Sequence, residues 1–161
     1  MSGRATPATV AAGRTKTTYT LHPYEVGEDG DGHSYGTDAA DAIGVPHHQV
    51  FKTLVAEVDG VFTVGVVPVS GALDLKALAA AVGGKKATMA DPARAEKITG
   101  YVRGGISPLG QRKRLRTVID SSVTSLGSVY VSAGRRGLQM ELMPADLIRL
   151  TEATTAPIAA G

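Results

Sequence analysis

The chain has 161 residues, of which 43% are hydrophobic and 20% are charged, a balance typical of a globular domain and not of a disordered chain. It contains no cysteine, which excludes a disulfide scaffold, a cysteine nucleophile and a cysteine-ligated zinc site. The formal net charge of +2 is too small to identify a partner by itself. There is no apolar run of membrane-spanning length and no signal peptide, so we expect a cytoplasmic protein without a membrane partner.

Charge is distributed unevenly along the chain. Residues 25–59 contain eight acidic side chains and one lysine, whereas residues 85–136 contain eleven basic side chains and three acidic ones. A locally basic surface attracts phosphates or acidic partners, although Lys and Arg scattered over a solvated face would give the same composition. The cluster at residues 112–116, Arg-Lys-Arg-Leu-Arg, favours a polyanionic partner.

The first third of the chain predicts two short helices and a strand. Residues 1–5 are expected to form a disordered tail. Thr6 followed by Pro7 is typical of a helix N-cap with proline in the first turn, and predicts a helix over residues 7–13. The next predicted elements are a Thr- and Tyr-rich strand (17–26), a Gly- and Asp-rich loop (27–36) and a helix that ends at Gly44 (37–44).

A β-hairpin is the clearest signal in the middle of the chain. Asp59-Gly60 separates two β-rich runs and predicts paired strands over 49–58 and 61–69. The remaining predictions are helices over 74–82, 92–99 and 144–150, strands over 86–89, 116–119, 129–132 and 138–142, a loop over 100–110 and a helical turn over 121–126. Residues 156–161 are expected to fray. Hairpins and helices without regular β-α-β alternation predict an α+β domain with a mixed or antiparallel sheet.

Lys52 lies on the apolar face of a predicted strand. Its neighbours on that face are Val50, Leu54, Ala56 and Val58, and the opposite face, with Phe51, Thr53, Val55, Glu57 and Asp59, is mixed and tolerates solvent. A buried lysine needs a partner, and no carboxylate in this segment shares its face. The partner is therefore elsewhere in the fold or is a ligand. Alternatively, Lys52 lies near the strand end and reaches solvent along its methylene stem.

Several common catalytic arrangements are excluded. Residues 105–109, Gly-Ile-Ser-Pro-Leu, are not a nucleophile elbow, because Leu109 replaces the final glycine and Pro108 lacks the backbone N–H of an oxyanion hole. All four histidines precede Ser107, which breaks the chain order of a hydrolase triad. The adjacent His47 and His48 lack metal-ligand spacing, and there is no phosphate-binding or dinucleotide-binding motif. We therefore expect neither a metal nor a cofactor.

Two glycine-rich segments could instead form the walls of a binding site. Gly104 and Gly105 would let the backbone approach a ligand closely, and the loop leads into the basic cluster. Residues 132–137, Ser-Ala-Gly-Arg-Arg-Gly, repeat the theme. An ordinary surface loop and a simple hairpin turn are the alternatives. Together with Lys52, the segments suggest a pocket with a basic rim, in which preorganised donors could support acyl transfer without a protein nucleophile.

The chain resembles the YbaK/EbsC family of bacterial Cys-tRNA(Pro) deacylases from about Thr6 to Leu150. The resemblance is carried by residues 50–54 (Val-Phe-Lys-Thr-Leu), 73–76 (Leu-Asp-Leu-Lys), 89–92 (Met-Ala-Asp-Pro), 99–101 with 104–111, and 130–134 (Tyr-Val-Ser-Ala-Gly). It implies an editing domain over residues 6–155, of the α+β class, with a mixed, barrel-like β-sheet flanked by short helices. The same fold is implied for the editing domain of many bacterial prolyl-tRNA synthetases.

The resemblance also implies the reaction. Cysteine is released from mischarged Cys-tRNA(Pro) in trans, by attack of the substrate's own thiolate on its ester with formation of a thiolactone, so that the enzyme supplies orientation and electrostatics. The implied partners are the acceptor end of tRNA(Pro) and prolyl-tRNA synthetase, with no cofactor. An Ala-tRNA(Pro) deacylase and a non-catalytic module that binds tRNA or a synthetase are the alternatives.

Site residues follow from the same resemblance. Lys52 matches the lysine required for activity. The positions implied for substrate binding are Tyr24, Tyr35, Thr53, Gly104, Gly105, Ile106, Ser107, Pro108, Ser132 and Gln139. Those expected to bind tRNA are Arg112, Lys113, Arg114, Arg135 and Arg136. Relatives often have an aspartate where this chain has Gln139, so an acidic role cannot be transferred, but the amide oxygen could accept a hydrogen bond.

Overall fold

The computed structural model describes residues 5–26 and 35–160. For Tyr35 it describes the backbone but not the side chain. Most of the tail predicted before Thr6 and most of the loop predicted over 27–36 lie outside the described residues. The elements run in the order α1 (Pro7–Arg14), β1 (Tyr19–Pro23), α2 (Tyr35–Ile43), η2 (His47–Gln49), β2 (Phe51–Val58), β3 (Val61–Pro68), β4 (Ala72–Leu73), α3 (Leu75–Ala81), β5 (Ala87–Met89), α4 (Pro92–Thr99), β6 (Arg116–Asp120), η3 (Ser121–Ser125), β7 (Val129–Arg135), β8 (Leu138–Leu142), α5 (Pro144–Thr151), β9 (Thr154–Ala156) and β10 (Ala159–Ala160).

Side-chain caps start the helices that the sequence predicted. The Thr6 hydroxyl accepts a hydrogen bond from the Thr9 N–H at 3.1 Å, and Asp74 and Asp91 accept the corresponding bonds at the start of α3 and α4. Such bonds satisfy N–H groups that have no partner within the helix. Gly100 ends α4 with a φ of 83°, a conformation that glycine adopts without strain.

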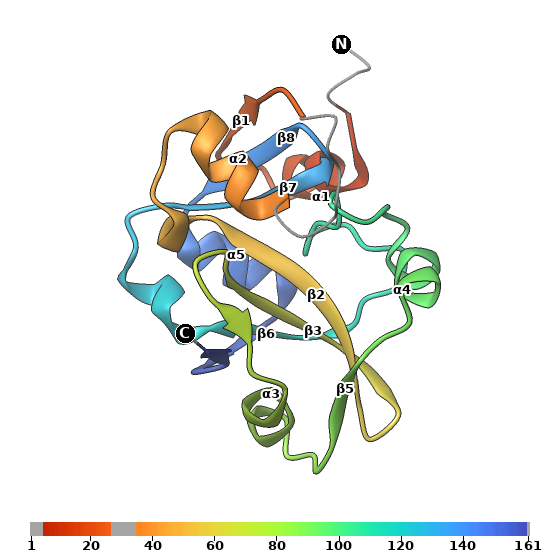
Figure 1. Cartoon of the computed structure of the whole chain (residues 1–161). Coiled ribbons are helices and arrows are strands. Elements are labelled where there is room, and N and C mark those ends of the chain that lie inside the picture. Colours follow the sequence, from red (N-terminus) through yellow and green to blue (C-terminus); the bar gives the residue numbers. More distant parts are fainter. Residues whose placement is uncertain (1–4, 27–34, 161) are drawn as a thin grey trace.

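Within residues 5–26 and 35–160, the strands form three sheets and mix parallel with antiparallel pairing. The largest has the order β5-β2-β3-β6-β9, in which β2 pairs antiparallel with β3 and β5, whereas β6 pairs parallel with β3 and β9. A second sheet has the order β1-β8-β7, and β4 pairs with β10. Figure 1 shows α1 and α2 beside the three-stranded sheet and α3 at the opposite end of the molecule. The mixed α+β architecture is confirmed, but the described strands do not close into a barrel.

Both faces of β2 are covered, which corrects one expectation. Phe51 and Val55, on the face expected to tolerate solvent, are only 2% and 4% exposed and belong to the main core. Ala56 and Val58, on the Lys52 face, pack in a second cluster with Leu78 of α3. The strand lies inside a sheet with packed layers on both sides, so alternation along β2 does not separate core from solvent.

Strand pairing orders residues 156–160, which corrects the prediction that this segment frays; Gly161 lies outside the described residues. β9 extends the five-stranded sheet beside β6, and β10 pairs with β4. Ile158 between them is fully buried. The Asp120 carboxylate accepts hydrogen bonds from the backbone N–H groups of Ile158 and Ala159, both at 2.9 Å. The residues that make these contacts are far apart in the sequence, so no local sequence pattern predicts them.

Candidate active site

Lys52 lines a cavity of about 290 Å³ at the junction of the two larger sheets. The start of β2 and the loop after α4 form two of its walls, and β7 and β8 contribute the third. Its lining consists of Gly36, Val50, Phe51, Lys52, Thr53, Leu54, Arg103, Gly104, Ile106, Ser132 and Gln139. An isolated bridge connects Val50, the residue directly before β2, to Tyr130 of β7. The structure thus brings together the lysine and residues from both segments that the sequence selected.

Lys52 is partly buried and has no anionic partner among the residues that the structure describes. It pairs in register with Val67 of β3, and partial burial desolvates its ammonium group. Desolvation disfavours the charged form and lowers the pKa of Lys52 below its usual value. An ammonium in this position gains most from a ligand that supplies negative charge.

Two buried polar atoms beside Lys52 have no hydrogen-bond partner within the described structure: the Thr53 hydroxyl oxygen and the Gln139 side-chain carbonyl oxygen. Both residues line the cavity, and they are only 8% and 5% exposed. Leaving such an atom unpaired costs about 1–3 kcal/mol. The fold carries this cost at two neighbouring positions, which is typical of a site that completes its hydrogen bonds with a ligand.

The loop after α4 is packed tightly against the turn that follows β7. The Gly105 N–H donates to the Val102 carbonyl at 2.9 Å, and the Arg136 Nε donates to the Arg103 carbonyl at 2.7 Å. Gly104 has a φ of 84°, which other residues rarely adopt. The two glycine-bearing segments are therefore in direct contact and form two walls of the cavity.

Other predicted substrate positions lie elsewhere. Ser107 is fully buried inside the loop, where its hydroxyl accepts a hydrogen bond from the Leu109 N–H at 3.2 Å. Pro108 lines a different cavity. The Tyr24 backbone N–H bonds to the Gly137 carbonyl, and Tyr24 is absent from the lining of the Lys52 cavity. The side chain of Tyr35 lies outside the described residues.

The predicted tRNA-binding side chains are exposed around the site and do not line the Lys52 cavity. Arg112 donates to the Lys97 carbonyl at 3.2 Å, and Arg114 lies 3.3 Å from the Glu152 carboxylate. Lys113, Arg135 and Arg136 complete the set. Arg103, which the sequence reasoning did not select, does line the cavity. Its place directly before Gly104 was the available signal.

The electrostatics of the cavity follow from this lining. Its described residues include two cations, Lys52 and Arg103, and no carboxylate. The arrangement suits the phosphate of a nucleotide or an ester oxygen that gains charge during acyl transfer. Over residues 5–26 and 35–160, no group of three or more His, Asp or Glu side chains is placed to hold a metal ion. Nor does any helix in those ranges have the length and apolar character needed to cross a membrane.

Comparison with known proteins identifies the family. The sequence model of the aminoacyl-tRNA editing domain matches residues 31–150. A protein of Enterococcus faecalis, EbsC, provisionally named a Cys-tRNA(Pro)/Cys-tRNA(Cys) deacylase, is 36% identical over 144 residues, which cover 89% of this chain and 86% of EbsC. The Escherichia coli K12 protein ProXp-y, named a multifunctional Ser/Thr-tRNA deacylase, is 31% identical over 80 residues, which cover 49% of this chain and 48% of ProXp-y.

The fold agrees with these relatives. A crystal structure described as a provisional trans-editing enzyme for prolyl-tRNA synthetase superimposes with a TM-score of 0.81 at 23% identity, over 98% of this chain and 99% of that one. The chain belongs to the aminoacyl-tRNA editing domain family. It is an aminoacyl-tRNA deacylase.

Proposed function

We propose that this deacylase releases cysteine from Cys-tRNA(Pro) in trans, and that the Lys52 cavity is its active site. The observation that carries the proposal is the partly buried ammonium of Lys52, which has no anionic partner among the described residues and faces a glycine-bearing wall. The similarity to EbsC over most of both chains supports the choice of cysteine.

Each lining group has a role in this proposal. Lys52 binds either the phosphate of the terminal nucleotide, which is negatively charged, or the carbonyl oxygen of the aminoacyl ester, on which negative charge develops during the reaction. The unpaired Gln139 oxygen accepts a hydrogen bond from the substrate amine, and the Thr53 hydroxyl pairs with a second polar group of the substrate. Gly104 lets the loop backbone approach the aminoacyl group closely. Ser132, whose hydroxyl accepts a hydrogen bond from the Gly134 N–H at 3.1 Å, holds the β7 side of the cavity in place.

The proposed reaction uses the substrate as its own nucleophile. The cysteine thiolate attacks the ester carbonyl carbon, the bond between that carbon and the ribose oxygen breaks, and the ribose oxygen takes up a proton. The products are free tRNA and a four-membered thiolactone, which water opens to cysteine. The protein contributes orientation and charge placement, because an intramolecular attack gains most from a fixed geometry. The chain itself has no cysteine.

The proposal extends to partners. The tRNA(Pro) acceptor end enters the cavity, and exposed basic side chains such as those of Arg112 and Arg136 attract the phosphate backbone of the tRNA. Prolyl-tRNA synthetase, the enzyme that produces mischarged tRNA(Pro), is the proposed protein partner, since editing in trans requires access to that product.

Three charged tRNAs test the proposal side by side: tRNA(Pro) carrying cysteine, serine or alanine. Serine replaces the sulfur of cysteine by oxygen, and alanine lacks the nucleophile altogether. Rapid loss of the cysteine ester alone, with capture of the thiolactone by an added amine, is the expected result. Equal rates for cysteine and alanine would refute the substrate-assisted route and favour an Ala-tRNA(Pro) deacylase.

A further inference from the structure

A second cavity, of about 430 Å³, lies on the other side of the loop that borders the Lys52 cavity. It is formed by the end of α1, residues 108–117 and the end of α5. Three arginines line it, Arg14, Arg114 and Arg149, and Glu152 is the only carboxylate in its described lining. Of these three, only Arg114 belongs to the basic cluster at residues 112–116, and Arg14 and Arg149 lie far from it in the sequence.

The cavity continues in both directions as a groove. A neighbouring hollow shares Arg14 and Gln111 with it and runs along the start of α1. Another shares Arg114 and Glu152, adds Arg116, and runs toward the end of α3. The described lining of the groove thus includes four arginines and one carboxylate, Glu152, and this excess of positive charge over an extended surface suits a chain of phosphates better than a single small anion.

The arginines keep donors available for a ligand. Arg149 donates to the Thr17 hydroxyl and to the Asp146 carboxylate, both at 3.1 Å, which fixes the direction of its guanidinium. Arg114 donates to the Leu150 carbonyl at 3.4 Å and pairs with Glu152. A guanidinium has five N–H donors, so each of these groups can also bind a phosphate oxygen. Arg14 has no hydrogen-bond or ion-pair partner in the described parts of the chain.

The groove is coupled rigidly to the Lys52 cavity. A Cβ atom at Gly110 would lie 2.3 Å from the Pro7 carbonyl oxygen, so α1 packs directly on the loop backbone. Thr6 also bonds through its hydroxyl to the Ala133 carbonyl, next to Ser132 of the cavity wall. Ile106 lines the Lys52 cavity and Pro108 the groove. Pro108 follows Ile106 by two positions, so their Cα atoms are at most about 7 Å apart, and the groove and the Lys52 cavity lie on two sides of the same short segment.

We propose that this groove is an RNA-binding track that holds backbone phosphates of the tRNA acceptor arm while the 3′ end occupies the Lys52 cavity. This inference rests on the proposed function for the identity of the RNA. Arg14 and Arg149 are its new members, and the groove, which includes Arg114 but not Arg112 or Lys113, provides the ordered part of the contact. An acidic protein segment is the other class of ligand with matching charge.

The test compares a double variant, Arg14→Gln with Arg149→Gln, with the wild type. Binding is measured with fluorescently labelled, uncharged tRNA(Pro) at several salt concentrations, which requires no catalysis. We expect Kd to rise about tenfold at low salt and the slope of log Kd against log salt to fall by about two, one for each lost phosphate contact. Arg14→Gln alone removes no hydrogen bond among the described residues and is expected to lower the slope by about one. This single variant keeps the test informative if the double variant misfolds.

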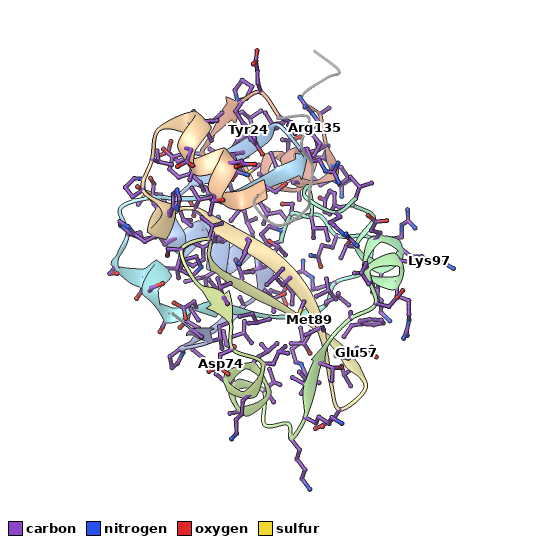
Figure 2. All side chains as sticks on the ribbon, viewed as in Figure 1. Tyr24, Glu57, Asp74, Met89, Lys97 and Arg135 are labelled. Atoms are coloured by element: carbon purple, nitrogen blue, oxygen red, sulfur yellow. The ribbon has the colours of Figure 1, made fainter. Side chains whose placement is uncertain are left out.

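Activity provides the second reading. On Cys-tRNA(Pro), kcat/KM of the double variant should fall about as much as the affinity, whereas hydrolysis of cysteinyl-adenosine, a nucleoside ester without phosphates, should be unchanged. The matched control, Lys76→Gln with Lys97→Gln, removes two charges from exposed side chains on α3 and α4; Figure 2 shows Lys97 pointing away from the body of the protein. It should leave both readings at the wild-type level.

Three outcomes decide the matter. An unchanged Kd and salt slope in the double variant would overturn the track and leave the groove to an acidic protein. An equal loss on tRNA and on cysteinyl-adenosine would also overturn it, because the arginines would then act on the reacting end. If the wild type hydrolyses neither substrate, the proposed function fails, but the binding measurement still confirms or refutes the RNA track.

Discussion

Gly105 lies directly against the backbone of Arg135, so that a Cβ atom on Gly105 would be only 2.8 Å from the Arg135 Cα atom and 2.9 Å from its carbonyl carbon. Backbone atoms cannot yield as the end of a flexible side chain can. The missing side chain therefore sets the distance between the loop that carries Gly104 and the strand that carries Ser132, which form opposite parts of the Lys52 cavity.

Gly105→Ala should separate these two walls. We expect the free energy of unfolding in urea to fall by about 1–3 kcal/mol and kcat to fall by about tenfold or more, because small displacements of positioning groups are costly. Gly13→Ala is the control, since a Cβ atom at Gly13 in α1 meets nothing within 4 Å. The control should be neutral or stabilised by up to about 1 kcal/mol. Equal unfolding free energies and equal kcat values for the two variants would show that the close packing at Gly105 affects neither stability nor activity.

Thr53→Val should separate stability from activity. Its hydroxyl has no partner within the described structure, so we expect the free energy of unfolding to stay unchanged or to rise by up to about 1 kcal/mol. kcat/KM on charged tRNA should nevertheless fall, because the ligand loses a hydrogen bond. Thr63→Val provides the comparison: Thr63 accepts a bond from Arg116 at 2.8 Å and donates to the Val61 carbonyl at 3.1 Å. That variant should lose about 1–3 kcal/mol, and a similar loss at Thr53 would contradict its assignment to the ligand.

Lys52→Met should stabilise the fold. Burial lowers the pKa of Lys52, so the unfolded chain holds this proton more readily than the folded chain does. The wild type is consequently penalised at neutral pH, and the penalty disappears as pH rises from the lowered pKa to the usual value of 10.5. The variant should unfold at a slightly higher urea concentration at pH 7, because solvent screens the partly exposed ammonium and keeps the gain small, and its advantage should shrink at alkaline pH. A less stable variant at pH 7 would indicate that Lys52 has a partner in the free protein.

Asp120→Ala should release the C-terminal segment. One carboxylate oxygen accepts bonds from the Ile158 and Ala159 N–H groups, and the other accepts the Ser122 N–H at 3.2 Å. We expect a loss of about 1.5–3 kcal/mol and faster hydrogen exchange over residues 154–160. Asp91→Ala, which removes a helix cap on the surface, should cost about 1 kcal/mol without changing exchange in that segment. Unaltered protection there in Asp120→Ala would mean that strand pairing alone holds the C-terminus.

Glu141 should make stability depend on pH in the acid range. The Ser128 hydroxyl, which donates to its carboxylate at 2.6 Å, and then His22, at 2.9 Å, hold the pKa of Glu141 below its usual value of 4.5, against the opposing effect of burial. A depressed pKa stabilises the fold above pH 4.5 and loses this effect as pH falls through the lowered value. The difference in unfolding free energy between the wild type and Glu141→Gln should therefore be constant near neutrality and shrink below pH 4.5. If the difference in unfolding free energy instead grew on acidification, the pKa of Glu141 could not be lowered in the folded protein.

Local signals predicted most elements of this fold. Thr6-Pro7 and Asp91-Pro92 mark helix starts through bonds that the adjacent residues complete, and Asp59-Gly60 closes the hairpin between neighbouring strands. The features that the sequence did not predict depend on contacts between residues that are distant in the sequence. The cover over both faces of β2, with Phe51 on one side and Val58 on the other, depends on elements distant in the sequence. The same is true of the pairing of β9 and β10.

The candidate site shows the same division. Strand alternation placed Lys52 on the side of Ala56 and Val58, and paired glycines indicated a close backbone approach. The family resemblance selected Thr53 and Gln139, but only the packed structure reveals that their side-chain oxygen atoms are buried and have no hydrogen-bond partner among the described residues. Ile106 and Pro108 are neighbours in one loop and nevertheless face different cavities. That distinction depends on how the loop packs on α1, which the sequence does not encode locally.

The most direct test of the account is single-turnover deacylation of Cys-tRNA(Pro) by the wild type, Lys52→Ala and Lys52→Arg. We expect rapid release of cysteine by the wild type, a loss of at least about a hundredfold in Lys52→Ala, and partial recovery in Lys52→Arg, which keeps the positive charge. The melting temperature of each variant verifies the fold. Wild-type turnover by a folded Lys52→Ala variant would contradict the assignment of the Lys52 cavity as the active site.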